Sequence, residues 1–247
     1  MKLPIGQFTN YQSTAEPLNP LISIVVPVYN EARTVADVIQ RLIAIDLPAP
    51  REILVVNDGS TDGTREVLDR ITERPELRII HAEKNGGKGS AIRIGFAKAS
   101  GTIVAIQDAD LELDPAQLAE LTQPILDGRS RVVYGSRFLA GRPAAPWLSI
   151  VANQVLTGVT NLLFGGRLTD METCYKVMTR DIAQSLNLES NRFDIEPEIT
   201  AKLLRAGHSI LELPIRFEPR SRAQGKKIGW RDGFRAIQVL VKYRFGK

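Results

Sequence analysis

Four short apolar segments alternate with three segments that carry helix signals in the first half of the chain, and this alternation constrains the fold more than any other feature. The apolar segments, which are typical of strands, cover residues 21–29, 52–57, 77–82 and 101–107. Helical patterns cover residues 32–45, 61–72 and 87–100. Strands connected by helices of this length form a parallel sheet that is covered on both faces. We therefore predict an α/β fold with a Rossmann-like, mostly parallel sheet flanked by helices.

Polar clusters follow three of the predicted strands, and they read "PVYNE", "NDGSTDGT" and "QDADLE". Ligands of open α/β sheets bind beyond the carboxyl ends of the strands, so these clusters predict the position of the site. The third cluster holds Asp108, Asp110 and Glu112, which point to one side if the segment is extended. Clustered carboxylates near a core are costly unless they share a cation, and Mg²⁺ prefers such oxygens. The spacing therefore predicts a metal site.

The second half of the chain is less regular. Strand patterns cover residues 131–138 and 208–219, and a helix is predicted over 147–164. A basic amphipathic helix is predicted at the C-terminal end, within 228–247. Each helix has an apolar face, formed by Val151, Val155, Val159 and Leu162 in the first and by Trp230, Phe234, Ile237 and Val241 in the second. We divide the chain into a loosely held lead-in (1–20), a main domain (21–227) and a C-terminal helical extension (228–247).

Charge and composition narrow the classes of partner and compartment. The net charge is +4, yet residues 216–247 hold ten Lys and Arg against two Asp and Glu, so the remaining 215 residues are net acidic. A basic end favours an anionic partner such as a phosphorylated ligand or a membrane surface. The single cysteine excludes an internal disulfide. We found neither a signal pattern nor an uninterrupted apolar run of membrane-spanning length, and we expect a cytoplasmic protein, at the inner face of the membrane if it is attached.

Five motifs in series carry a family resemblance. They read "SIVVPVYNE", "VVNDGSTDGT", "NGGKGSAIRIGF", "DADLE" and "YGSRF". In this order, over residues 21–227, the chain resembles the inverting nucleotide-sugar glycosyltransferases of family 2, and within them the dolichyl-phosphate mannose synthase and polyprenyl-phosphate glycosyltransferase branch. The resemblance implies a GT-A fold and a divalent cofactor, Mg²⁺ or Mn²⁺. It also implies transfer of a hexose from a nucleotide sugar, of the GDP-mannose or UDP-glucose type, to a polyprenyl or dolichyl phosphate.

The same resemblance assigns roles to individual residues. It places catalytic function at Asp110, Arg137 and Asp170, and metal binding at Asp108, Asp110 and Glu112, although the branch usually has glutamine at position 112. Arg220 and Lys226 match a loop that closes over the diphosphate. The predicted nucleotide-sugar pocket is formed by Pro27, Tyr29, Glu31, Val56, Asp58, Asp108, Ala109, Asp110, Arg137, Arg220 and Lys226.

Several roles stay open at this stage. A hydroxyl acceptor would need a carboxylate base, for which Asp170 and Glu172 are candidates, whereas a phosphate acceptor is already ionised near neutral pH. Lys88 is either a solvated side chain or a phosphate ligand at a helix start. Cys174 is expected to be an inert packing residue. The acids of the segment "RFDIEPEIT", Asp194, Glu196 and Glu198, are expected at a helix N-terminus.

Two other functions compete with the lipid-phosphate transferase. One is a metal-dependent glycosyltransferase with a soluble hydroxyl acceptor, and the other is a protein that binds a nucleotide sugar without catalysis. A dehydrogenase is disfavoured because no G-x-G-x-x-G follows the first strand. Nucleic-acid binding is disfavoured because the basic excess is terminal and has no recognisable module. The sequence makes no prediction of oligomeric state.

Overall fold

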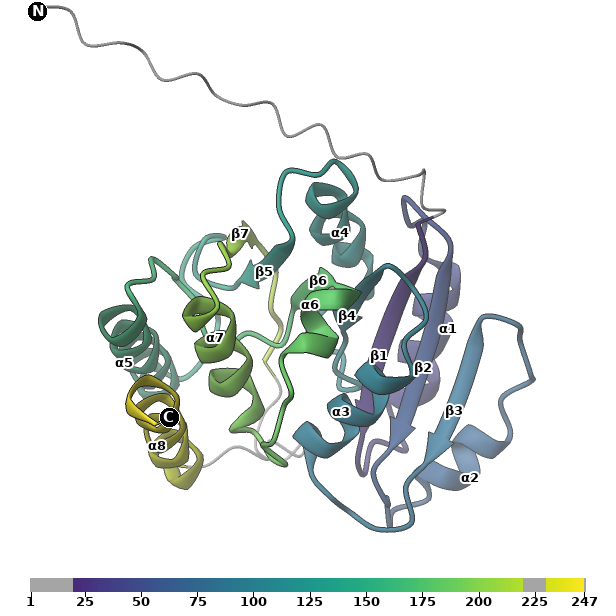
Figure 1. Ribbon diagram of the computed structural model, residues 1–247. Helices are drawn as coiled ribbons and strands as arrows, with labels where there is room; N and C mark the ends of the chain where they lie inside the picture. The colour runs from purple at the N-terminus through teal and green to yellow at the C-terminus, as the bar shows by residue number, and fades with distance from the viewer. Residues whose placement is uncertain (1–19, 220–229, 247) are drawn as a thin grey trace, which may run out of the picture.

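A seven-stranded sheet forms the centre of the computed structural model, which describes residues 20–219 and 230–246 (Figure 1). The strand order is β3-β2-β1-β4-β6-β5-β7. Strand β6 pairs antiparallel with β4 and β5, and the other pairs are parallel. The strands are β1 (Ile22–Val28), β2 (Arg51–Asn57), β3 (Leu77–His81), β4 (Ile103–Ile106), β5 (Val132–Ser136), β6 (Lys176–Thr179) and β7 (Leu211–Pro214). The predicted mostly parallel α/β fold is confirmed.

Helices cover both faces of this sheet, with α3 and α6 on one face and α1 and α4 on the other (Figure 1). Strand β1 is buried along its whole length because it lies near the centre of the sheet between β2 and β4, as its continuous apolar run requires. The helices are α1 (Val35–Ala44), α2 (Thr64–Asp69), α3 (Lys88–Lys98), the 3₁₀ turn η1 (Pro115–Gln117), α4 (Leu118–Leu126), α5 (Trp147–Phe164), α6 (Arg180–Ser185), α7 (Ile195–Arg205) and α8 (Trp230–Phe245).

The direction of β6 brings an additional loop to the ligand-binding edge. Because β6 runs against β4, with Ala105 opposite Val177, the residues that precede β6 lie beside the residues that follow β4. The hydroxyl of Tyr175 donates a hydrogen bond to Gln107 Oε1 at 2.6 Å and fixes this contact. The segment 170–175 therefore faces the acidic cluster, although it lies at the amino end of its own strand.

The acidic cluster after β4 is a turn, not an extended segment as predicted. Strand β4 ends at Ile106, and Leu111 adopts a left-handed conformation with φ of 61°. The backbone N–H of Glu112 donates to Asp110 Oδ1 at 3.1 Å, which closes the turn on itself. The two-residue alternation therefore does not align Asp108, Asp110 and Glu112, and the turn is what brings all three to the site described below.

Helices α5, α7 and α8 pack together beside the sheet and enclose a second apolar core. This core is formed by Leu156, Leu168, Met171, Ala201, Ala236, Leu240 and Tyr243. Helix α5 has the length and composition of a membrane-spanning helix, which the count of uninterrupted apolar residues did not indicate. The outward apolar residues form a surface that we call the α5–α8 face, and they are Trp147, Leu148, Val151, Val155, Leu162, Phe234, Ile237, Val241 and Phe245.

Some predictions fall on parts of the chain that the structure does not describe. The lead-in, apart from residue 20, and the predicted diphosphate ligands Arg220 and Lys226 lie outside the described residues. The division at residues 20 and 227 remains a prediction.

Candidate active site

A cavity of about 350 Å³ opens at the edge of the sheet where β1, β2 and β4 end. It brings together most of the residues predicted from the sequence. Val56 and Asp170 do not line it: Val56 is buried in β2 and Asp170 is fully buried behind the cavity wall. The predicted residues that do line it are Pro27, Tyr29, Glu31, Asp58, Asp108, Ala109, Asp110, Glu112 and Arg137.

Asp58 fixes the end of the cavity next to β1 and β2. Its two carboxylate oxygens accept the backbone N–H groups of Gly86 and Gly87 at 2.8 and 2.7 Å. Burial raises the pKa of Asp58, and these two hydrogen bonds only partly oppose the shift. Gly59 follows with φ of 63°, and a Cβ there would lie 2.6 Å from the backbone of Asn85. The NDG sequence thus joins β2 to the glycine-rich loop that begins α3.

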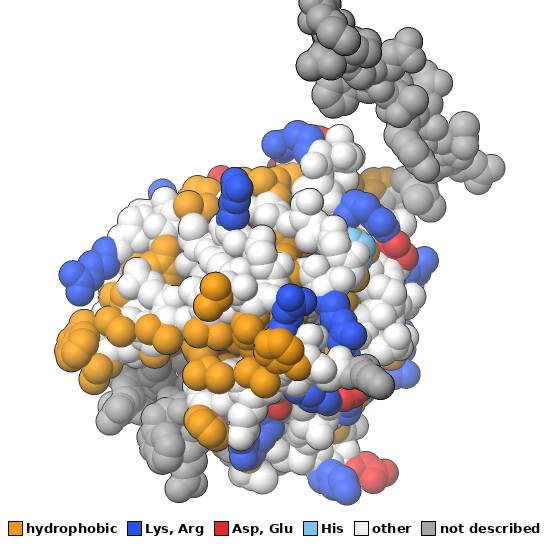
Figure 2. Space-filling model, turned by 60° about the vertical axis from the view of Figure 1, so that its left-hand side comes forward, with side chains coloured by type: hydrophobic (Ala, Val, Ile, Leu, Met, Phe, Trp, Pro, Cys, Tyr) orange, Lys and Arg blue, Asp and Glu red, His pale blue; other side chains and the backbone are white. Residues whose placement is uncertain are grey.

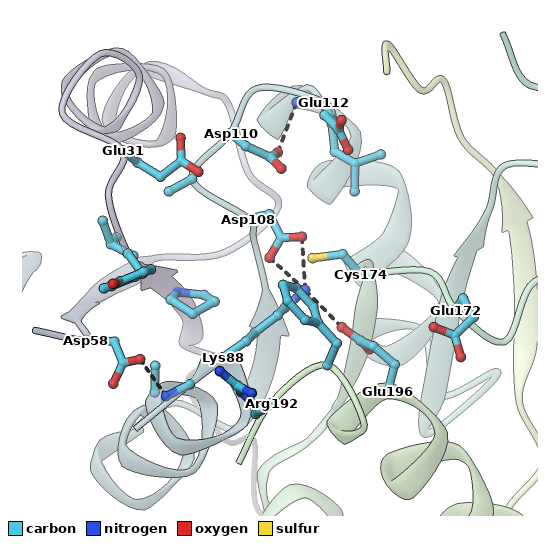
Figure 3. Close-up of a pocket in the computed structure, with 18 of the residues that line it drawn as sticks. Glu31, Asp58, Lys88, Asp108, Asp110, Glu112, Glu172, Cys174, Arg192 and Glu196 are labelled. Atoms are coloured by element: carbon cyan, nitrogen blue, oxygen red, sulfur yellow. Dashed lines mark hydrogen bonds and ion pairs between the residues drawn. The ribbon is translucent and has the colours of Figure 1, made fainter. Parts of the chain in front are cut away.

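Lys88 lies at the centre of the cavity and pairs with two acids (Figure 3). Its Nζ lies 2.9 Å from Asp108 Oδ1, 3.0 Å from Asp108 Oδ2 and 2.9 Å from Glu196 Oε1. Burial alone would lower the pKa of Lys88, but the charges of Asp108 and Glu196 outweigh it and raise that pKa well above its usual value. Lys88 is therefore a charged member of the site and not a solvated side chain.

Glu196 continues this network into the protein interior. Its Oε2 accepts a hydrogen bond of 2.5 Å from the fully buried Lys176, which also donates to the carbonyl of Met171 at 3.1 Å. Burial raises the pKa of Glu196, but Lys176 and Lys88 oppose it and the net shift is downward. Four charges thus alternate in sign in the order Asp108, Lys88, Glu196, Lys176. The predicted position of Glu196 in the first turn of a helix is confirmed, but its place in the site was missed.

Arg137 forms the wall of the cavity near Phe217. Its guanidinium lies 5.2 Å from the centre of the Phe217 ring and makes two hydrogen bonds of 2.7 Å to Asp170. A buried carboxylate held in this way positions an arginine, and it is poorly placed to take a proton from a substrate. This geometry favours a positioning role for Asp170, and its catalytic role stays a prediction.

Glu172, the other candidate base, lines the cavity. Its Oε1 is buried, with no hydrogen-bond partner among the described residues. Burial raises its pKa from 4.5 to about 7, with Lys176 opposing the shift. Cys174 also lines the cavity, and burial raises the pKa of its thiol well above the usual value, which is consistent with the inert character predicted for it.

The carboxylate oxygens at the cavity suit a hard divalent cation that takes only part of its ligands from the protein. Among the residues that the structure describes, no group of three His, Cys, Asp or Glu side chains is close enough to hold a metal ion by itself. Mg²⁺ usually takes one or two carboxylates, with water and phosphate oxygens completing its shell. The carboxylates of Asp108, Asp110 and Glu112, which border one cavity, fit that mode of binding.

The Glycosyl transferase family 2 model matches residues 23–186, about two thirds of the chain. The chain belongs to glycosyl transferase family 2. The family assignment agrees with the position of the cavity, because the matched region supplies the residues at the ends of β1, β2 and β4.

Two relatives named as sugar transferases extend this match. The chain is 30% identical over 207 residues to glycosyltransferase AglD of Haloferax volcanii, covering 81% of this chain and 33% of that protein. It is 27% identical over 213 residues to dolichol-phosphate mannosyltransferase of Pyrococcus furiosus, covering 84% and 59%. The chain thus spans from a third to three fifths of these relatives.

A solved structure supports the fold. Glucosyl-3-phosphoglycerate synthase of Mycobacterium tuberculosis, in complex with Mn²⁺, uridine diphosphate and glucosyl-3-phosphoglycerate, superposes with a TM-score of 0.70 at 19% identity. The match covers 91% of this chain and 80% of that one. The GT-A fold predicted for the family 2 chain is confirmed.

Proposed function

We propose that this chain transfers a hexose from a nucleotide sugar to the phosphate of a polyprenyl lipid, with inversion at the anomeric carbon. The observation that carries the proposal is that one cavity joins Tyr29 and Asp58, which are predicted to bind the nucleotide, to an arginine wall at Arg137. The Pyrococcus relative is named for a dolichol-phosphate acceptor, which supports a lipid phosphate here.

In a single displacement reaction, different residues of the cavity would have different roles. Asp108, Asp110 and Glu112 would hold Mg²⁺ or Mn²⁺, which neutralises charge on a departing diphosphate. Tyr29, Glu31 and Asp58, which line the cavity, would border the nucleoside. Lys88 would bring a cation close to the transferred sugar and its diphosphate. Arg137, oriented by Asp170, attracts the acceptor phosphate from the opposite end. Arg220 and Lys226 are expected to assist at the diphosphate.

The α5–α8 face supports peripheral attachment to a membrane. Figure 2 shows hydrophobic side chains gathered in a band on this side of the molecule, with Lys and Arg side chains beside it. Three side chains are especially exposed: Leu162 at 84%, Phe245 at 72% and Leu148 at 64%. An apolar band bordered by basic residues fits an anionic bilayer, where the lipid acceptor resides. We expect the protein at the cytoplasmic face of that membrane.

Glu172 favours one alternative, a soluble hydroxyl acceptor. Glu172 has a carboxylate oxygen with no hydrogen-bond partner in the described part of the chain, and its pKa is about 7. These are properties of a general base, which a hydroxyl nucleophile requires. A donor screen with and without acceptor separates the two functions.

The test uses the full chain, GDP- and UDP-hexoses, Mg²⁺ or Mn²⁺, and a short-chain prenyl phosphate. We expect metal-dependent release of nucleoside diphosphate that the prenyl phosphate accelerates, and a glycosylated prenyl phosphate as product. Asp110→Ala is expected to abolish both. Release of nucleoside diphosphate that requires a sugar or glycerate hydroxyl, and that prenyl phosphate does not accelerate, would support the alternative acceptor. Binding of the donor with no turnover for any acceptor would support a non-catalytic binding protein.

A further inference from the structure

Glu172 is an ionisable group of the cavity whose purpose the proposed reaction leaves open. A phosphate acceptor brings its own negative charge to the anomeric carbon and needs no base. Yet Glu172 lines the cavity near Arg137, and its buried Oε1 meets no hydrogen-bond partner among the described residues. A buried oxygen without a partner costs about 1–3 kcal/mol. Such a cost is offset when a ligand supplies the missing partner.

Four charged groups from neighbouring segments act on Glu172. Lys176 and Arg137 favour its ionised form, whereas Glu196 and Asp170 oppose it. Burial is the largest influence, and the resulting pKa is about 7. Near neutral pH a large share of the molecules therefore carries a neutral carboxyl at this position, and a neutral carboxyl can donate a hydrogen bond.

We propose that Glu172 binds the acceptor head group by donating a hydrogen bond from its neutral carboxyl to an oxygen of the phosphate that Arg137 attracts. This inference rests on the proposed function, since it requires a phosphate acceptor. A carboxylate in the same place would repel a phosphate dianion, whereas a carboxyl proton complements it. The wall of the cavity thus offers the phosphate a cation and a neutral donor side by side.

The reaction leaves this proton in place. A phosphate oxygen forms a bond to the anomeric carbon, and the bond from that carbon to the diphosphate oxygen breaks. The diphosphate departs with the electron pair, and the acceptor changes from a phosphomonoester to a phosphodiester. No proton is gained or lost in these steps, so Glu172 acts throughout as a hydrogen-bond donor. This is the opposite protonation state from the one that a general base requires.

The decisive experiment compares the wild type with Glu172→Gln over pH 6 to 9, using a short-chain prenyl phosphate and the preferred donor. The glutamine amide donates a hydrogen bond at every pH and has nearly the same shape. We expect the KM for the acceptor to be similar in both enzymes at pH 6. By pH 9 we expect it to be about tenfold or more higher in the wild type, because the neutral fraction of Glu172 falls above its pKa. The acceptor's own titration affects both enzymes equally, so it cancels in the ratio of the wild-type KM to the variant KM.

Two further measurements complete the design. Calorimetric titration measures the binding of prenyl phosphate to each enzyme without turnover, in the presence of nucleoside diphosphate and metal. The ratio of the wild-type to the variant dissociation constant should change with pH in the same way as the ratio of KM values. Glu120→Gln, which changes an exposed glutamate of α4, should follow the wild type at every pH. A ratio that does not vary with pH would overturn the role of Glu172 and leave the proposed function standing.

The remaining outcomes are equally distinct. A loss of about 100-fold or more in kcat for Glu172→Gln at unchanged acceptor KM would overturn the inference, because it indicates a general base. Failure of the wild type to glycosylate any prenyl phosphate would overturn the proposed function and this inference together.

Discussion

The guanidinium of Arg137 and the carboxylate of Asp170 form a bidentate pair, with Nε–Oδ2 and Nη2–Oδ1 distances of 2.7 Å each. The same carboxylate also accepts the backbone N–H of Arg137 at 3.0 Å. Three hydrogen bonds from one residue to another fix the arginine in a single orientation at the cavity wall. Its pKa is raised, because the pairing with Asp170 outweighs burial, which alone would lower it.

If Asp170 acts through Arg137, their substitutions should not be additive. We expect Asp170→Asn and Arg137→Lys each to lower kcat/KM for the acceptor about 100-fold, since lysine cannot reproduce the planar bidentate contact. The double variant should lose little more than either single variant. Steady-state kinetics of the four proteins measures the coupling, and losses that multiply would show that the two side chains act independently.

Glu172 should make stability depend on pH. Its pKa is about 7 in the folded protein against 4.5 in the unfolded chain. The stability that this raised pKa confers is therefore complete below pH 4.5 and is lost as the pH rises through 7. We compare the unfolding free energies of Glu172→Gln and the wild type. As the pH rises from 5 to 8, their difference should shift by about 2–3 kcal/mol in favour of the variant. Urea unfolding at both pH values measures this gain, and Glu120→Gln should show none.

Lys88 should compete with a divalent cation for Asp108. Lys88→Met leaves the Asp108 carboxylate without its described cationic partner, and we expect a loss of about 3 kcal/mol in stability. Added Mn²⁺ should then raise the melting temperature of this variant more than that of the wild type, without any nucleotide. Lys98→Met, at the exposed end of α3, is the matched control. An equal Mn²⁺ effect in all three proteins would contradict the competition.

The α5–α8 face should determine binding to lipid vesicles. We expect Val155→Asp combined with Leu162→Asp to weaken sedimentation with anionic vesicles at least tenfold, because each charge replaces an apolar contact with the bilayer. These residues are 54% and 84% exposed, so folding should be unaffected. Gln40→Asp, on exposed α1 surface, controls for added charge. Turnover of a soluble short-chain acceptor should be unchanged, and a parallel loss there would point to misfolding instead.

Local patterns were sufficient to predict the framework of the fold. The strands after which Tyr29, Asp58 and Asp108 lie are largely apolar runs, and segments with helix signals separate them. Their carboxyl ends necessarily meet at one edge of a parallel sheet, so the end of the cavity at Tyr29 and Asp58 followed directly. The details of the turn at Leu111 did not follow, because left-handed backbone at a leucine has no reliable sequence signal.

The other end of the cavity, near Arg137, depended on information that local patterns do not contain. Cys174 and Glu172 reach the cavity because β6 runs antiparallel, and strand direction cannot be read from the residues of a single short strand. Lys176 and Glu196 lie 20 residues apart in different elements. An available signal was Lys176, the first residue of β6, since a charged residue in a buried strand needs a partner.

The alternating order of Asp108, Lys88, Glu196 and Lys176 also limits how such an enzyme can change its substrate. Neutralising either inner member, Lys88 or Glu196, removes the partner of an outer charge, Asp108 or Lys176. A viable route to a new sugar or head group must therefore alter an inner member together with its outer neighbour. Variants selected for a different donor should therefore carry replacements at two or more of these four residues. Successive replacements should occur at residues that are paired with each other.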